Sequence, residues 1–182
     1  MRDVTKVAIG GLLHDIGKLL YRSGDGRSHA ESGYEFLKER ANLQDNEILA
    51  QIRYHHVAGI KNAPVPSNSL AYITYIADNI AAAADRRKSD DHGRGFVREL
   101  PLESIFNRLN GNDQELHYKA GDLKTAIRFP QQGSVNYETD FYNKCVAQIS
   151  DAVRGIEFTD AYVNSLSEIL ESCTSYIPSS TS

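Results

Sequence analysis

Apolar residues recur at helical spacing over most of the chain, in segments that polar loops separate. The first such segment predicts a helix over residues 3 to about 21. Its apolar positions are Val4, Val7, Ala8, Leu12, Ile16 and Leu19. Ser28 and Asp45 are suited to cap two further helices, from residue 29 to about 40 and from residue 45 to about 56.

A loop with two prolines is expected over residues 61–68, and a long helix over residues 70 to about 87. Ser67 or Asn68 is the expected cap of that helix. Its apolar stripe consists of Ile73, Ile76, Ala77, Ile80 and Ala84, which predicts the face that it buries.

The pattern changes over residues 88–137, which are rich in Gly, Asn, Asp and Gln. We expect an irregular insertion here, in which residues 116–118 and 126–129 could pair as a small hairpin.

Helical periodicity returns over residues 137–156 and 159–176. Residues 177–182, rich in Ser and Thr after a proline, are expected to be a linker to a further domain. The sequence thus predicts a mainly α domain over residues 1–176.

Composition narrows the class of protein. The chain has 182 residues, of which 41% are hydrophobic and 24% charged, with a net charge of -4, an ordinary balance for a globular protein. Its two cysteines, Cys145 and Cys173, form no CxxC pattern, which argues against a disulfide scaffold, a zinc ribbon or a redox site. No signal peptide or membrane span is expected, and we predict a cytoplasmic protein.

The most informative position is Asp15, which follows His14 in the largely apolar run Leu-Leu-His-Asp-Ile-Gly-Lys. An ionised carboxylate in such a setting needs a compensating cation. The adjacent imidazole makes a divalent metal the natural one. On a helix the two side chains would diverge by about 100°, and Lys18, one turn after His14, would face the same cavity.

Further candidate ligands follow on the later helices: His29, the pair His55–His56, and Asp78 in an apolar setting. Because His55 and His56 are adjacent, we expect one of them to bind metal and the other to touch substrate or support the site. Together these residues predict a metal-dependent phosphohydrolase. The alternative is a purely structural network of ion pairs between the carboxylates and nearby Lys and Arg residues.

These motifs resemble the HD superfamily of metal-dependent phosphohydrolases, whose hallmark is a His-Asp dyad. His14–Asp15 matches the dyad, His29 the intermediate His motif, His55–His56 the paired-His motif, and Asp78 in Ile-Ala-Asp-Asn-Ile the terminal Asp motif. The resemblance implies a helical bundle.

The dyad differs from the usual pattern because only 13 residues precede it and none of them is a histidine. An early dyad resembles the circularly permuted HD domain in the large subunit of type III-A CRISPR effector complexes. Permutation implies that the displaced helix lies behind the core. Water, substrate or Asp85 would replace the missing ligand.

The resemblance implies a metal-dependent nuclease that acts on single-stranded DNA, with the other subunits of an RNA-guided CRISPR complex as partners. Asp15 would bridge two ions, with His14 and Asp78 on one ion and His29 plus His55 or His56 on the other. Mn²⁺ is the expected metal, with Ni²⁺, Co²⁺ or Fe²⁺ as other candidates, because mixed nitrogen and oxygen ligands disfavour Mg²⁺. Substrate contacts are expected from Lys18, Asp85 and Arg86.

Two other functions fit the same residues. One is hydrolysis of nucleotides or cyclic nucleotides, although no Gly-Tyr-Pro follows His55–His56. The other is a non-catalytic module that docks partner subunits through its C-terminal helices.

Overall fold

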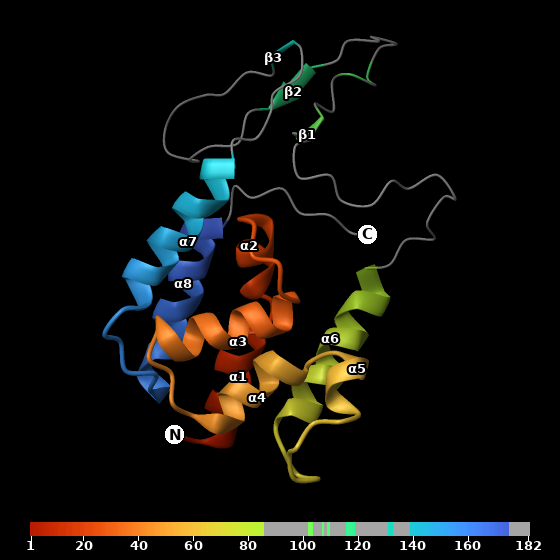
Figure 1. Ribbon diagram of the computed structural model, residues 1–182, viewed down its shortest axis with the longest axis vertical. Helices are drawn as coiled ribbons and strands as arrows, with labels where there is room; N and C mark the ends of the chain where they lie inside the picture. Colours follow the sequence, from red (N-terminus) through yellow and green to blue (C-terminus); the bar gives the residue numbers. More distant parts are fainter. Residues whose placement is uncertain are drawn as a thin grey trace.

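The computed structural model describes residues 1–85 and 139–174, together with 102–103, 107, 109, 116–118 and 131–132 of the intervening segment. Helices dominate these residues (Figure 1). The N-terminal part contains α1 (Asp3–Leu13), α2 (Gly17–Arg22), α3 (His29–Glu39), α4 (Asn46–Tyr54), α5 (Val57–Ile60) and α6 (Ala71–Asp85). The C-terminal part contains α7 (Thr139–Val153), a 3-10 turn (Asp160–Tyr162) and α8 (Val163–Thr174). The prediction of a mainly helical bundle is therefore confirmed.

The predicted caps of α3 and α4 are confirmed. The Ser28 hydroxyl accepts a hydrogen bond from the Glu31 amide, and Oδ1 of Asp45 accepts from the amides of Glu47 and Ile48. Each cap satisfies backbone donors that a helix start leaves without an intrahelical partner.

The cap predicted for α6 is wrong. The amide of Leu70 donates to Oε2 of Glu47, and the amide of Ala71 donates to the Ser69 hydroxyl. Glu47 comes from α4, so a tertiary contact, rather than Ser67 or Asn68, satisfies the start of this helix.

The first predicted helix is interrupted. Residues 14–16 form a turn between α1 and α2, in which the Ile16 amide donates to the Leu13 carbonyl and the Lys18 amide to the Asp15 carbonyl. These bonds span three residues instead of four, so the chain is wound more tightly here than in an α-helix. The interruption lies at the His-Asp dyad.

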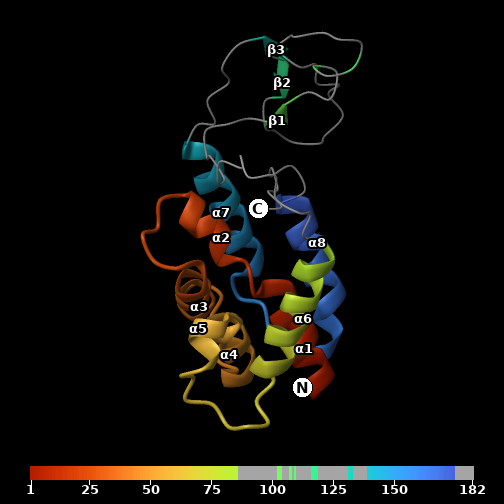
Figure 2. The same ribbon diagram turned by 90° about the vertical axis from the view of Figure 1, so that its right-hand side faces the viewer.

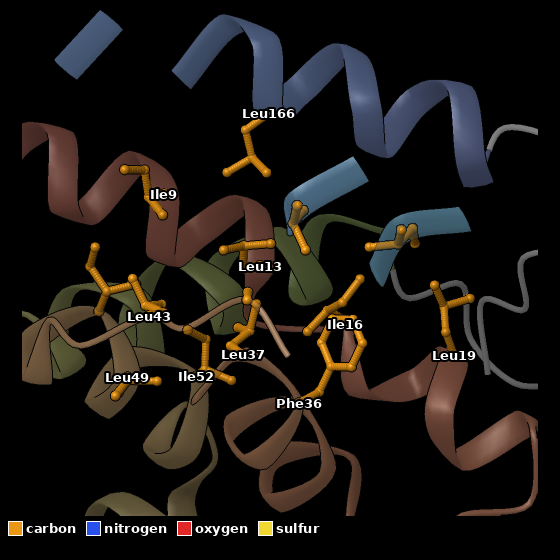
Figure 3. Close-up of a cluster of buried hydrophobic side chains, with 14 of the residues drawn as sticks. Ile9, Leu13, Ile16, Leu19, Phe36, Leu37, Leu43, Leu49, Ile52 and Leu166 are labelled. Atoms are coloured by element: carbon orange, nitrogen blue, oxygen red, sulfur yellow. The ribbon is translucent and has the colours of Figure 1, made fainter. Parts of the chain in front are cut away.

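The core is built by α1 to α4 with the C-terminal helices. Leu13 is completely buried at its centre, and Leu166 of α8 reaches it from the far end of the sequence (Figure 3). Helix α7 packs on α2, and α8 packs on α1 and α7. The two views agree that these C-terminal helices lie along the N-terminal ones (Figures 1 and 2). They close the core with the buried residues Tyr142, Ile149, Val153 and Leu166.

The face predicted to be buried on α6 is wrong, because Ile73, Ile76 and Ile80 are exposed. Among the apolar positions of the first segment, Ile16 and Leu19 are buried, as are Ile9 and Leu13, while Val4 is exposed. Helix α6 contacts α4, α1 and α5, and it buries Ala71 and Thr74 near its start.

A small antiparallel sheet follows α6 in the chain, with strands β1 (Leu102–Glu103), β2 (Leu116–Tyr118) and β3 (Gln131–Gln132) in that order. Strand β2 confirms the prediction for residues 116–118. Its predicted partner at 126–129 lies outside the described residues, as does the expected linker at 177–182. Among the helices that the structure describes, none is long and apolar enough to cross a membrane.

Candidate metal centre

The turn at residues 14–16 carries His14 and Asp15. The backbone of His14 stays αR (φ -54°, ψ -36°) and the turn is wound at least as tightly as an α-helix, so the two side chains leave it in different directions. The ends of the two side chains nevertheless meet. Nε2 of His14 lies 3.4 Å from Oδ2 of Asp15. Lys18 Nζ donates to that same oxygen at 2.6 Å, so the lysine pairs with Asp15.

The other carboxylate oxygen of Asp15 faces a second group of residues. Oδ1 lies 3.6 Å from Nε2 of His29 and 3.7 Å from Nε2 of His55. This oxygen is buried and has no hydrogen-bond partner among the residues that the structure describes. The two oxygens of one carboxylate therefore point to two different sets of ring nitrogens.

The second group comes from the start of α3 and the end of α4. His29 is the first residue of α3, and its Nε2 lies 3.3 Å from Nε2 of His55 and 2.6 Å from Nε2 of His56. One ring nitrogen of each of these three histidines lies within 4.8 Å of the others, close enough to share one metal ion.

We expected one of His55 and His56 to bind metal and the other to touch substrate or support the site, and the structure places both rings beside His29. The chain leaves α4 at this point, with His55 helical and His56 extended (φ -106°, ψ 152°). Helical divergence of neighbouring side chains therefore does not apply, and both rings face His29.

Asp78 reaches the same centre from α6. Its Oδ1 lies 3.5 Å from Nε2 of His14, so the first imidazole stands between two carboxylates. The structure thus brings together His14, Asp15, Lys18, His29, His55, His56 and Asp78. Asp85 is the last residue of α6, but its side chain lies outside the described residues, and so does Arg86.

Backbone carbonyls fix which ring nitrogen of two histidines is available. Nδ1 of His14 lies 2.7 Å from the Gly11 carbonyl, and Nδ1 of His55 lies 2.7 Å from the Ile52 carbonyl. A carbonyl oxygen only accepts hydrogen bonds, so each Nδ1 carries a proton. In the neutral rings Nε2 then directs a lone pair toward Asp15, which is the arrangement that metal-binding histidines adopt.

Burial and neighbouring charges shift the pKa values of these groups in opposite directions. Burial and the neighbouring His56 lower the pKa of His55 to about 4, and burial also lowers the pKa of His29. For His14 the effect of burial is outweighed by Asp15 and Asp78, which raise its pKa. Burial would raise the pKa of Asp15, but hydrogen bonds from His14 and Lys18 hold it well below its usual range. Around pH 7 the centre thus offers the ionised carboxylate of Asp15 and the neutral imidazoles of His29 and His55.

Those features fit a divalent transition metal. The buried Oδ1 of Asp15 lacks a partner, and electron-pair donors from four histidines and two carboxylates converge around it. Nitrogen and oxygen donors of this kind suit Mn²⁺, Fe²⁺, Co²⁺ or Ni²⁺ better than an all-oxygen metal such as Mg²⁺.

Two residues that support the centre were missed at the sequence level. Gln51, one turn before His55, is completely buried, and its amide donates to the carbonyls of Lys6 and Glu47. Its Oε1 accepts from the hydroxyl of Thr74, one turn before Asp78. This hydrogen bond sets the register between the helices that carry His55 and Asp78. A glutamine within an otherwise apolar helix face was the available signal.

Comparison with known proteins agrees with this geometry. Residues 1–83 match the model of the HD domain. The whole chain aligns at 34% identity with 26% of the CRISPR system single-strand-specific deoxyribonuclease Cas10/Csm1 (subtype III-A) of Enterococcus italicus. For the protein of the same name from Streptococcus thermophilus, identity is 33% over 94% of this chain and 24% of the relative.

The fold also matches a solved structure. The crystal structure of the Csm1–Csm4 subcomplex in the type III-A CRISPR-Csm interference complex superposes with a TM-score of 0.63, at 18% identity, over 100% of this chain and 25% of that one. The chain spans about a quarter of the length of these relatives. Residues 1–83 thus match the HD domain, and the chain is similar over its whole length to part of the type III-A Cas10/Csm1 proteins.

Proposed function

We propose that this chain is a metal-dependent nuclease that hydrolyses phosphodiester bonds of single-stranded DNA. The observation that carries the proposal is the division of the Asp15 carboxylate. Its Oδ2 faces His14, while its buried, unpartnered Oδ1 faces His29 and His55. A carboxylate placed in this way can bridge two cations.

The ligands divide accordingly. His14 and Asp78 would hold one ion with Oδ2 of Asp15, and His29, His55 and His56 would hold the other with Oδ1. Mn²⁺ is the proposed metal. Divalent ions held there supply Lewis acidity, which polarises a phosphoryl oxygen and lowers the pKa of water.

The chain's own residues orient the reaction. The Gly11 and Ile52 carbonyls hold Nδ1 of His14 and His55, so that Nε2 of each ring is directed at the centre. Lys18 lies at the edge of the centre with a side chain that is 53% exposed, so its ammonium can exchange Asp15 for a phosphate oxygen of the substrate. Roles for Asp85 and Arg86 in holding the DNA strand remain predictions.

The relatives support both the substrate and the partners in this proposal. The two Cas10/Csm1 relatives are named as single-strand-specific deoxyribonucleases, and the similar solved chain forms a subcomplex with Csm4. We propose the same substrate for this chain, and assembly with other subunits of an RNA-guided complex.

A metal-by-substrate matrix tests the function. The chain is stripped with a chelator, reloaded with Mn²⁺, Ni²⁺, Co²⁺, Fe²⁺ or Mg²⁺, and incubated with linear and circular single-stranded DNA, RNA, duplex DNA and mononucleotides. We expect Mn²⁺-dependent degradation of single-stranded DNA. The Asp15→Asn variant should lose at least about a hundredfold in rate, since partners one step removed from a metal already contribute 10- to 100-fold.

Asp151→Asn is the matched control, because Asp151 is exposed on α7 and forms an ion pair with the exposed Arg154. Full activity of folded Asp15→Asn would refute the proposal. Turnover of mononucleotides without action on polymers would favour a nucleotide phosphohydrolase. Absence of bound metal by elemental analysis, with no cleavage of any substrate, would favour a docking module.

A further inference from the structure

A groove of about 230 Å³ runs between α1 and α6 and ends at the candidate metal centre. The two helices pack against each other, and α6 runs beside α1 in Figure 2. Helix α1 lines the groove with Val7 and Gly11, and α6 lines it with Thr74, Ala77 and Ala81. His14 and Asp78 close one end, so the groove shares two residues with the metal centre.

The walls are apolar and have little capacity for directional bonds. The proton of the Thr74 hydroxyl is donated to Gln51, at 2.7 Å, and is not available to a ligand. At Gly11 no heavy atom lies within 4 Å of where a Cβ would stand, so the missing side chain leaves open space. Ala77 and Ala81 are exposed to solvent and offer only methyl groups.

Size and chemistry restrict the occupant. Pockets for drug-sized ligands measure roughly 300 Å³ or more, so this groove suits a single flat ring system. A ring bound there would lie next to His14 and Asp78, and a phosphate attached to it would reach the metal centre. We do not expect a phosphate group to bind in the groove, because its apolar lining residues provide no positive charge.

We propose that this groove binds one unpaired nucleobase of the DNA strand, adjacent to the phosphate that is hydrolysed. The proposal rests on the proposed nuclease function and deepens it. Apolar walls without free donors contact any base, so they give affinity without reading sequence. A base that is paired in a duplex is covered by its partner strand, so entry requires a single strand or an unstacked, flipped nucleotide. The groove thereby accounts for a preference for single strands.

Filling the groove tests the proposal. Ala81→Leu places a larger side chain in it, and Ala83→Leu makes the same change on an exposed position of the same helix outside the groove lining. The Kd of each Mn²⁺-loaded protein is measured by fluorescence anisotropy with labelled phosphorothioate oligothymidylate, which resists hydrolysis. We expect Ala81→Leu to raise the Kd roughly tenfold, equivalent to about 1.4 kcal/mol, and Ala83→Leu to leave it within about twofold.

A strand of equal length built from abasic nucleotides separates base binding from backbone contacts. It should bind wild type and Ala81→Leu equally, and more weakly than oligothymidylate binds wild type. Gly11→Leu fills the groove from the opposite wall and should also raise the Kd for oligothymidylate, while Mn²⁺ binding followed by electron paramagnetic resonance stays unchanged in Ala81→Leu.

Three results would overturn the groove proposal: an unchanged Kd in both groove variants, an equal loss of affinity for the abasic strand, or no binding of oligothymidylate by wild type. Failure of the nuclease proposal is seen separately, as intact unmodified single-stranded DNA after incubation with the Mn²⁺-loaded wild type.

Discussion

Gly17 sits where α2 and α3 approach most closely, and replacing it with alanine tests whether that approach builds the metal centre. A Cβ at this position would overlap the His29 carbonyl oxygen and would lie 2.7 Å from both the His29 carbonyl carbon and the Gly33 amide nitrogen. All these atoms belong to the backbone, so no flexible side chain can move aside.

The size of the effect follows from these distances. To regain an ordinary contact of 3.4 Å with the His29 carbonyl carbon and the Gly33 amide nitrogen, α2 and α3 must separate by about 0.7 Å at this point, and clearing the His29 carbonyl oxygen requires a larger shift. Overpacking of a well-filled core costs about 1–3 kcal/mol, and we expect the upper end because backbone lies on both sides. Metal–ligand distances tolerate only about 0.2 Å. Moving His29, the first residue of α3, should therefore weaken Mn²⁺ binding at least about tenfold.

The assay pairs urea unfolding of the metal-free protein with calorimetric titration of Mn²⁺. Gly26→Ala is the control, because Gly26 lies in the loop between the same two helices with open space where its Cβ would stand. It should change the free energy of unfolding by less than about 0.5 kcal/mol. If Gly17→Ala unfolds within 1 kcal/mol of wild type and binds Mn²⁺ equally well, then the contact between α2 and α3 does not position His29.

Three further predictions concern the support of the centre. Thr74→Val should lower the free energy of unfolding, measured in urea, by about 1–3 kcal/mol, because it leaves the buried Oε1 of Gln51 without a donor. Thr74→Ser should restore the stability of wild type. Equal stability of wild type and both variants would contradict the role of this hydrogen bond. In the metal-free protein the ring of His55 should titrate near pH 4 when followed by NMR. The stability that its neutral form contributes should be fully present above pH 6.5 and decline as the pH falls toward 4. A titration midpoint at or above pH 6 would contradict the burial of the ring. Asp45→Ala removes the cap of α4 and should lower the free energy of unfolding by about 1–2 kcal/mol. Asp45→Asn keeps the accepting oxygen and loses only the ion pair with Lys6, so it should lower that free energy by under about 1 kcal/mol. Similar losses in the two variants would show that the ion pair and not the cap stabilises this end.

Local chemistry made part of the fold predictable. Ser28 and Asp45 cap helices where the sequence indicated, because a cap depends on residues at most three positions away. The start of α6 was not predictable in this way, since its amide at Leu70 is satisfied by Glu47 from another helix.

Periodicity predicted that helices exist but misplaced the face that α6 buries. On α6 the isoleucines looked like a core stripe, yet Ile73, Ile76 and Ile80 are exposed and the helix buries the smaller Ala71 and Thr74. A helix with apolar residues on several sides has no face that the sequence alone selects. Which side is covered depends on the neighbours, here α4 and α1.

The sequence by itself determined the chemistry of the centre: the His-Asp dyad, the later histidines and Asp78 are residue types that bind a divalent metal, and their motifs resemble those of the HD family. Only the tertiary structure decided how they meet. Where the chain leaves α4, His56 is extended rather than helical, so the rings of His55 and His56 both face His29. Packing of α2 on α3 and the hydrogen bond between Gln51 and Thr74 then bring four separate segments together, with Asp15 within 4 Å of His29 and His55, and His14 within 4 Å of Asp78. Ligand identity is carried by single residues, whereas ligand position depends on contacts between segments that are distant in the chain.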